Sequence, residues 1–171
     1  ENPDLQMTVL YGLGTYQTMK GDIHAGHQTF VHLSNVADDL GVPRYDVMSA
    51  SLLTWSYYNR GHYRSAVEYG GRVREFYAEG AWTNTGAHTN AADPLVVSDA
   101  FLAASQWVLG DPSLARKTAG EVLEYAKSAN DPYSLAYAYT NSSIRAIDMI
   151  EDWETLFERA ESGIELSDKL G

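Results

Sequence analysis

Three histidines that lie close together come nearest to a pattern that could perform chemistry. His24 and His27 are three residues apart, which places both imidazoles on one face of a helix, where they could hold a metal ion. His32 lies five residues further on and falls off that face. No carboxylate completes a known ligand set, and the His-Glu-x-x-His pattern is absent. We therefore expect solvent-exposed histidines, no metal site and no cofactor.

The sequence also lacks the patterns that mark common enzyme sites. It contains no cysteine, which excludes disulfides, thiolate metal sites and a thiol nucleophile. We find no glycine-rich phosphate loop, no Gly-x-Ser-x-Gly elbow and no paired catalytic acids. We expect a protein that is not an enzyme. The rival interpretation, an enzyme built on a helical array, would require titratable groups to converge around Arg145 and Asp148.

The charge of the chain limits its partners. Lys and Arg number 12 and Asp and Glu 23, which gives a net charge of -11 over 171 residues. Such a surface repels phosphate backbones and anionic lipid headgroups, so we expect neither nucleic acid nor membrane as the main partner. The lack of cysteine is compatible with a reducing compartment, and we expect a cytoplasmic protein. Because the chain opens Glu1-Asn2-Pro3, we interpret it as a fragment of a longer protein.

The elements that must position any site follow from a repeat along the chain. Equivalent turns recur at spacings of 40, 49 and 41 residues, at Gly21-Asp22, Gly61-His62, Gly110-Asp111 and Glu151-Asp152. A proline precedes each turn by 16 to 19 residues, at Pro3, Pro43, Pro94 and Pro132. Most of these prolines follow Asn or Asp, which is typical of a helix start with a capping side chain and Pro in the first position.

We therefore predict an all-α chain in which each unit is helix, turn, helix. The expected hairpins cover roughly 3–41, 43–80, 94–130 and 132–170, within a single domain spanning 1–171. The first helices run roughly over 4–20, 44–60, 95–109 and 133–150, and the second over 22–40, 62–79, 112–129 and 152–170. Residues 80–93 are rich in Gly, Asn and Thr and are predicted to form a loop, with Trp82 and His88 as its candidates for a packing anchor or a contact.

Small residues at repeated positions predict close packing within each hairpin. They fall seven residues before each turn, at Gly14, Thr54, Ala103 and Ile144, and five residues after it, at Gly26, Ala66, Ala115 and Leu156. The fourth unit departs most from this pattern, and Phe30 is a large exception in the first. We expect the leucines that precede the first set, Leu13, Leu53 and Leu102, to fill the seams between hairpins.

This layout resembles the tetratricopeptide repeat (TPR), although its repeats are about 40 residues long rather than about 34. The resemblance rests on the small residues and on the turns, and it implies a right-handed superhelix of four TPR-like hairpins. The stretch from Asp93-Pro94-Leu95 through Trp107-Val108-Leu109-Gly110 to Asn130-Asp131-Pro132 is similar to the helical arrays of large bacterial signalling ATPases that carry a cyclase or a LuxR-type DNA-binding domain. That likeness implies a non-catalytic module that senses or docks a partner.

In such arrays the first helices line a concave face. Carrying the family's groove positions onto this chain predicts partner contacts at Tyr11, Thr15, Trp55, Tyr58, Asn59, Trp107, Asn141 and Arg145. The mixture of rings, amides and one guanidinium suits a peptide or protein partner. Three alternatives stay open: Trp55, Tyr58 and Trp107 belong to the core; the aromatic groove senses a small ligand such as a sugar; or the chain forms a homo-oligomer through an uncapped end.

Overall fold

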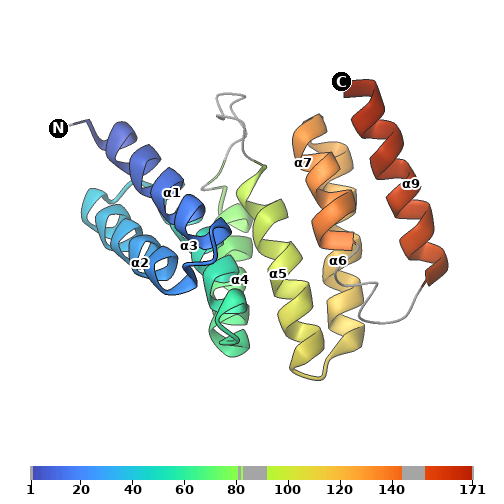
Figure 1. Cartoon of the computed structure of the whole chain (residues 1–171), viewed down its shortest axis with the longest axis horizontal. Helices are drawn as coiled ribbons and strands as arrows, with labels where there is room; N and C mark the ends of the chain where they lie inside the picture. The colour runs from blue at the N-terminus through green and yellow to red at the C-terminus, as the bar shows by residue number, and fades with distance from the viewer. Residues whose placement is uncertain (1, 81, 83–91, 144–152, 171) are drawn as a thin grey trace. The chain divides into compact units, whose positions relative to one another are not determined.

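The computed structural model describes residues 2–80, 82, 92–143 and 153–170, and the described residues form helices and short turns with no strand (Figure 1). The helices are α1 (Pro3–Met19), α2 (Ile23–Leu40), α3 (Pro43–Asn59), α4 (Tyr63–Ala78), α5 (Pro94–Val108), α6 (Pro112–Ser128), α7 (Pro132–Tyr137), the π-helical turn η1 (Ala138–Ser143) and α9 (Trp153–Leu170). The contacts divide the chain into two compact units, Glu1–Trp82 and Thr83–Gly171, which are described separately.

The helices begin and end where the capping pattern predicts. The side chain of Asn2 accepts hydrogen bonds from the first backbone N–H groups of α1, and aspartates do the same for other helices, at Asp22, Asp93, Asp111 and Asp131. The turn glycines Gly21, Gly61 and Gly110 have φ of 97°, 72° and 94°, a left-handed conformation that glycine adopts without steric cost. These caps and turns set the length of each hairpin.

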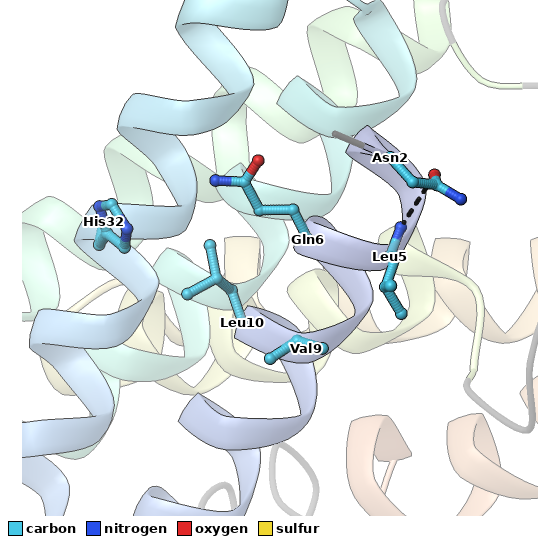
Figure 2. A pocket seen from close by; sticks show the side chains of 6 residues that line it. All are labelled: Asn2, Leu5, Gln6, Val9, Leu10 and His32. Atoms are coloured by element: carbon cyan, nitrogen blue, oxygen red, sulfur yellow. Dashed lines mark hydrogen bonds between the residues drawn. The ribbon is translucent and has the colours of Figure 1, made fainter.

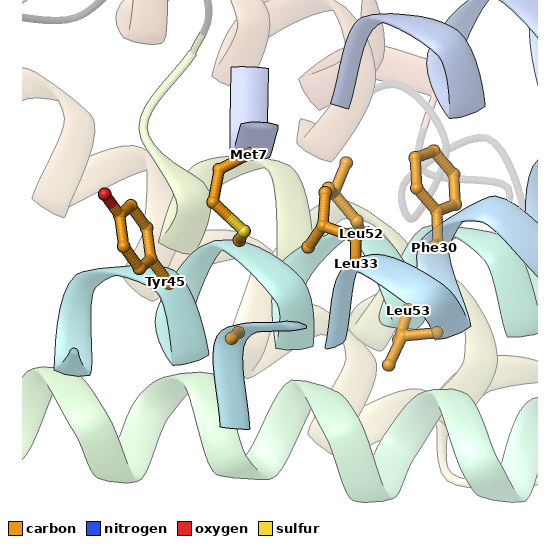
Figure 3. Close-up of a cluster of buried hydrophobic side chains, with 7 residues drawn as sticks. Met7, Phe30, Leu33, Tyr45, Leu52 and Leu53 are labelled. Carbon is orange, nitrogen blue, oxygen red and sulfur yellow. The ribbon is translucent and has the colours of Figure 1, made fainter. Parts of the chain in front are cut away.

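In the first unit, α1 pairs with α2, α2 packs against α3, and α3 pairs with α4. Figure 3 shows the core between these helices. It consists of Met7, Phe30, Leu33, Ala37, Tyr45, Leu52 and Leu53, all nearly or completely buried. The small residues expected at the hairpin crossing allow this packing: a β-carbon at Gly14 would overlap the ring of Phe30, and one at Gly26 would overlap the hydroxyl of Thr18. Phe30 is thus a large residue that lies over a glycine.

In the second unit, α5 pairs with α6, η1 packs against both, and α9 lies against α7 and η1. Asp93 joins the starts of two helices: its carboxylate caps α5 and accepts a hydrogen bond from Tyr125 of α6 at 3.1 Å. Its backbone N–H donates to the Ser134 hydroxyl of α7 at 2.8 Å. These bonds bring three helices of this unit together at their ends.

Two expectations need correction. The first helix of the last hairpin is not one regular α-helix, because α7 gives way to a π-helical turn after Tyr137. Within this turn the Thr140 hydroxyl donates to the carbonyls of Ala136 and Tyr137. Leu13 does not fill a seam, since it is 45% exposed whereas Leu53 and Leu102 are buried.

Candidate functional site

Two of the predicted contact residues are partly core residues. Tyr11 of α1 and Trp55 of α3 are partly buried and pack against the core of the first unit. The Trp55 ring lies 5.8 Å from the ring of Phe30, tilted by 44°. This packing supports the alternative that Trp55 belongs to the core, because much of its surface is already in contact with the protein. The remaining exposed surface is what a partner could touch.

Thr15 differs from its neighbours on α1. The residue as a whole is partly buried. Its hydroxyl oxygen is shielded from solvent and has no hydrogen-bond partner among the described residues. A buried hydroxyl without a partner costs free energy, so most are satisfied by protein, water or ligand. Thr15 occupies the place in the first hairpin that Trp55 occupies in the second, because each lies six residues before its turn glycine. Its oxygen is therefore an unsatisfied polar group inside the protein, and not one that a molecule at the surface can reach.

Tyr58 and Asn59 lie at the carboxyl end of α3. Both are partly buried, and the Tyr58 ring meets the edge of the Tyr63 ring at 5.8 Å from centre to centre. The end of a helix presents carbonyl oxygens as well as side chains, which makes it a polar rim beside the aromatic rings. Five of the predicted residues thus lie on α1 and α3 of the first unit.

The second unit carries the other three predicted residues. Trp107 is partly buried on α5, one residue before that helix ends. Asn141 lies in η1, and its side-chain amide donates to the Thr140 hydroxyl at 3.1 Å. Arg145, and with it Asp148, lies outside the described residues. The structure therefore does not test the cluster around which an enzymatic site would have to form.

A shallow hollow of about 370 Å³ lies elsewhere, between α1 and α2 (Figure 2). Its lining residues are Asn2, Leu5, Gln6, Val9, Leu10 and His32. None of them is a predicted partner contact, and sequence reasoning missed this hollow. The signal that could have found it is the apolar spacing of Leu5 and Val9, which places both side chains on one face of α1.

The histidines do not behave as one exposed group. His24 and His32 are exposed, as expected, but His27 is buried, and its Nδ1 lies 2.9 Å from the hydroxyl of Ser56. The expectation of a solvent-exposed residue is wrong for His27, because α2 buries it against α3. Among the residues that the structure describes, no group of three or more His, Asp or Glu is placed to hold a metal ion.

His27 belongs to a polar and aromatic cluster that sequence reasoning also missed. The Tyr57 ring lies 4.9 Å from the His27 ring, edge-on, and stacks on Tyr69 at 5.3 Å. Burial lowers the pKa of His27, and the charges of Arg60 and other neighbours lower it further. The cluster holds α2, α3 and α4 together and keeps the imidazole neutral at neutral pH.

None of the helices within the described ranges combines the length and the apolar character needed to cross a lipid bilayer. No protein-family model matches the chain, and no curated protein matches it. Among solved structures it is similar to a Rap protein complexed with competence and sporulation factor, with a TM-score of 0.71 and 14% identity. The match covers 99% of this chain and 45% of that chain, so this chain spans less than half of the length of its neighbour. At this identity the likeness shows the fold, and it confirms the expected all-α, TPR-like helical-repeat architecture.

Proposed function

We propose that this chain is a non-catalytic binding module of a larger bacterial regulatory protein in the cytoplasm, and that it binds a peptide or a protein segment. In the first unit the proposed contacts are Tyr11, Thr15, Trp55, Tyr58 and Asn59. Trp107, Asn141 and Arg145 remain proposed contacts of the second. The solved neighbour with the same fold is complexed with competence and sporulation factor, which supports a binding role for this architecture.

The observation that carries the proposal is the set of partly exposed rings and polar side chains on α1 and α3 of the first unit, Tyr11, Trp55, Tyr58 and Asn59. A peptide in extended conformation carries backbone N–H and C=O groups along its length, which a side-chain amide such as that of Asn59 can bond. The rings can contact apolar side chains of the same peptide. A polar group beside a ring is the combination that fixes the position of a bound chain.

The charge of the module narrows the choice of partner. With a net charge of -11, it attracts basic partners and repels acidic ones before contact. We therefore propose a neutral or basic peptide. Its binding would favour one conformation of the module and so change the state of an attached effector domain, such as a nucleotide cyclase or a LuxR-type DNA-binding domain.

The test is a binding screen with an array of short synthetic peptides that vary in charge and aromatic content, followed by calorimetry with the best binder. Tyr58→Ala removes a ring that the proposal places against the peptide, and we expect it to weaken binding by roughly tenfold. Tyr133→Ala, an exposed tyrosine on α7, serves as the matched control. Thr15→Val keeps the shape and removes a hydroxyl that is shielded from solvent, and we expect it to stabilise the free protein by about 1 kcal/mol, because the unsatisfied group is gone.

A result in which no peptide binds would overturn the proposal. If a panel of simple sugars instead quenched tryptophan fluorescence, and Trp55→Phe reduced that signal, the module would be a small-ligand sensor. If Tyr58→Ala left peptide affinity as it was, the binding face would lie elsewhere on the chain.

A further inference from the structure

A buried histidine lies where the two hairpins of the first unit meet. His27 of α2 is 9% exposed, and its Nδ1 lies 2.9 Å from the hydroxyl of Ser56 on α3. The ring of Tyr57, the next residue of α3, meets the imidazole edge-on at 4.9 Å. These three residues form the polar part of the α2–α3 contact, here called the α2–α3 joint. A neutral imidazole fits this place, because it shares a hydrogen bond with a hydroxyl and lies against a ring.

The charged groups that act on His27 are basic. Arg60 lies at the carboxyl end of α3, His62 at the start of α4, and His24 one turn earlier on α2. Burial lowers the pKa of His27 most, and these three neighbours lower it further. A proton on His27 therefore places a positive charge in a desolvated position beside other basic side chains, which is unfavourable in the packed structure.

The carboxylates of the helices packed here do not pair with the imidazole. At the start of α2, Asp22 accepts a hydrogen bond from the N–H of Ala25 at 3.1 Å. On α1, Asp4 pairs with Arg44 at the end of the unit opposite to His27. The other titratable side chains of α1, α2 and α3 are Tyr11, Tyr16, Lys20, His32, Asp38, Asp39, Tyr45, Asp46, Tyr57 and Tyr58. Within the described ranges, no hydrogen bond or ion pair joins His27 to a carboxylate that would stabilise its charged form.

The α2–α3 joint also sets the geometry of the proposed binding face. That face belongs to α1 and α3, and these two helices are held together through α2, which packs against both. Asp4 links α1 to α3 directly, through Arg44 and Tyr45, but at the opposite end of the unit. Ser56 directly follows Trp55 and precedes Tyr58 by two residues, so the joint lies beside the proposed contacts of α3.

We propose that the α2–α3 joint is an acid-sensitive switch: a proton on His27 opens it and takes apart the binding face that α1 and α3 share. The effect on a peptide rests on the proposed function, whereas the opening itself does not. The sign follows from linkage. As the pH falls through about 6.5, the open form takes up a proton on His27 that the closed form does not, so acid shifts the equilibrium towards the open form.

Thiol labelling measures the opening, because the chain has no cysteine of its own. Ser49→Cys places one thiol on α3, at a residue that is 4% exposed and lies two turns before Ser56 on the same side of the helix. Its rate of reaction with dipyridyl disulfide, divided by the rate of glutathione at the same pH, reports how often the joint opens. We expect this ratio to rise by about three- to tenfold from about pH 7.5 to about pH 5.5. With His27→Gln added, which keeps a hydrogen-bonding group but cannot titrate, the ratio should stay constant.

Two controls separate the joint from general effects of acid. His32→Gln removes an exposed histidine of the same helix and should leave the rise as it is with Ser49→Cys alone. Ser105→Cys places the thiol at a buried residue of α5, whose hydroxyl bonds a carbonyl of its own helix as that of Ser49 does, and should show no rise. Circular dichroism checks that every variant stays helical, and His27→Met and Ala37→Cys replace any variant that does not.

Calorimetry at the same two pH values tests the link to binding, with an amidated peptide that carries no histidine or carboxylate. We expect the wild-type chain to bind it more weakly at the lower pH and His27→Gln to bind it equally at both. A labelling ratio that does not rise with acid, or that rises equally with and without His27→Gln, would overturn the proposal. So would a rise in labelling with no change in peptide affinity. If no peptide binds at about pH 7.5, the proposed function is wrong, while the labelling still decides whether His27 opens the joint.

Discussion

At the scale of single residues, the packing of the first hairpin depends on where side chains are missing. A β-carbon at Gly14 would overlap the ring of the fully buried Phe30, whereas one at Gly12 would meet nothing within 4 Å. We expect Gly14→Ala to lower the free energy of unfolding by about 1–3 kcal/mol through overpacking. Gly12→Ala, on the same helix, should raise it by about 0.5–1 kcal/mol, because alanine favours the helix. Urea denaturation measures both, and equal effects of the two substitutions would contradict this account.

The pKa of His27 predicts how stability depends on pH. Burial lowers this pKa below its ordinary value of about 6.5, and Arg60, His62 and His24 lower it further. As the pH falls through about 6.5, the unfolded chain therefore takes up a proton that the folded protein does not. We expect the free energy of unfolding to decrease between about pH 7.5 and pH 5.5, and His27→Gln to remove part of that decrease. The difference between wild type and variant isolates this residue, and parallel curves would show that His27 does not contribute.

At the scale of helices, the sequence predicts where each helix begins and ends better than which helices pack against one another. The expected first helix over 4–20 is observed as Pro3–Met19, and the expected helix over 44–60 as Pro43–Asn59. These boundaries are local, because a capping oxygen, a proline and a left-handed glycine act within a few residues. The break after Tyr137 was not predictable in this way, since no proline, glycine or capping side chain marks it in the sequence.

For the candidate site, too, the sequence predicts what is local and does not predict what depends on packing between helices. Sequence reasoning predicts Trp55 as a partner contact and leaves a core position open, but only the structure shows that its ring packs against Phe30. Periodicity identifies an apolar face and does not say which helix will cover it. For this reason Leu13 was assigned to a seam although it is exposed, and His27 was assigned to the surface although it is buried.

At the scale of the whole molecule, the net charge of -11 acts on the proposed peptide partner. Opposite charges attract at long range and salt screens that attraction, whereas apolar contacts with aromatic rings depend little on salt. We expect a basic peptide to bind more weakly at about 0.5 M NaCl than at about 0.05 M, because the ions screen the attraction. Calorimetry at the two salt concentrations measures the change, and a neutral peptide of the same length is the control. An affinity of the basic peptide that did not change with salt would mean that the net charge does not select the partner.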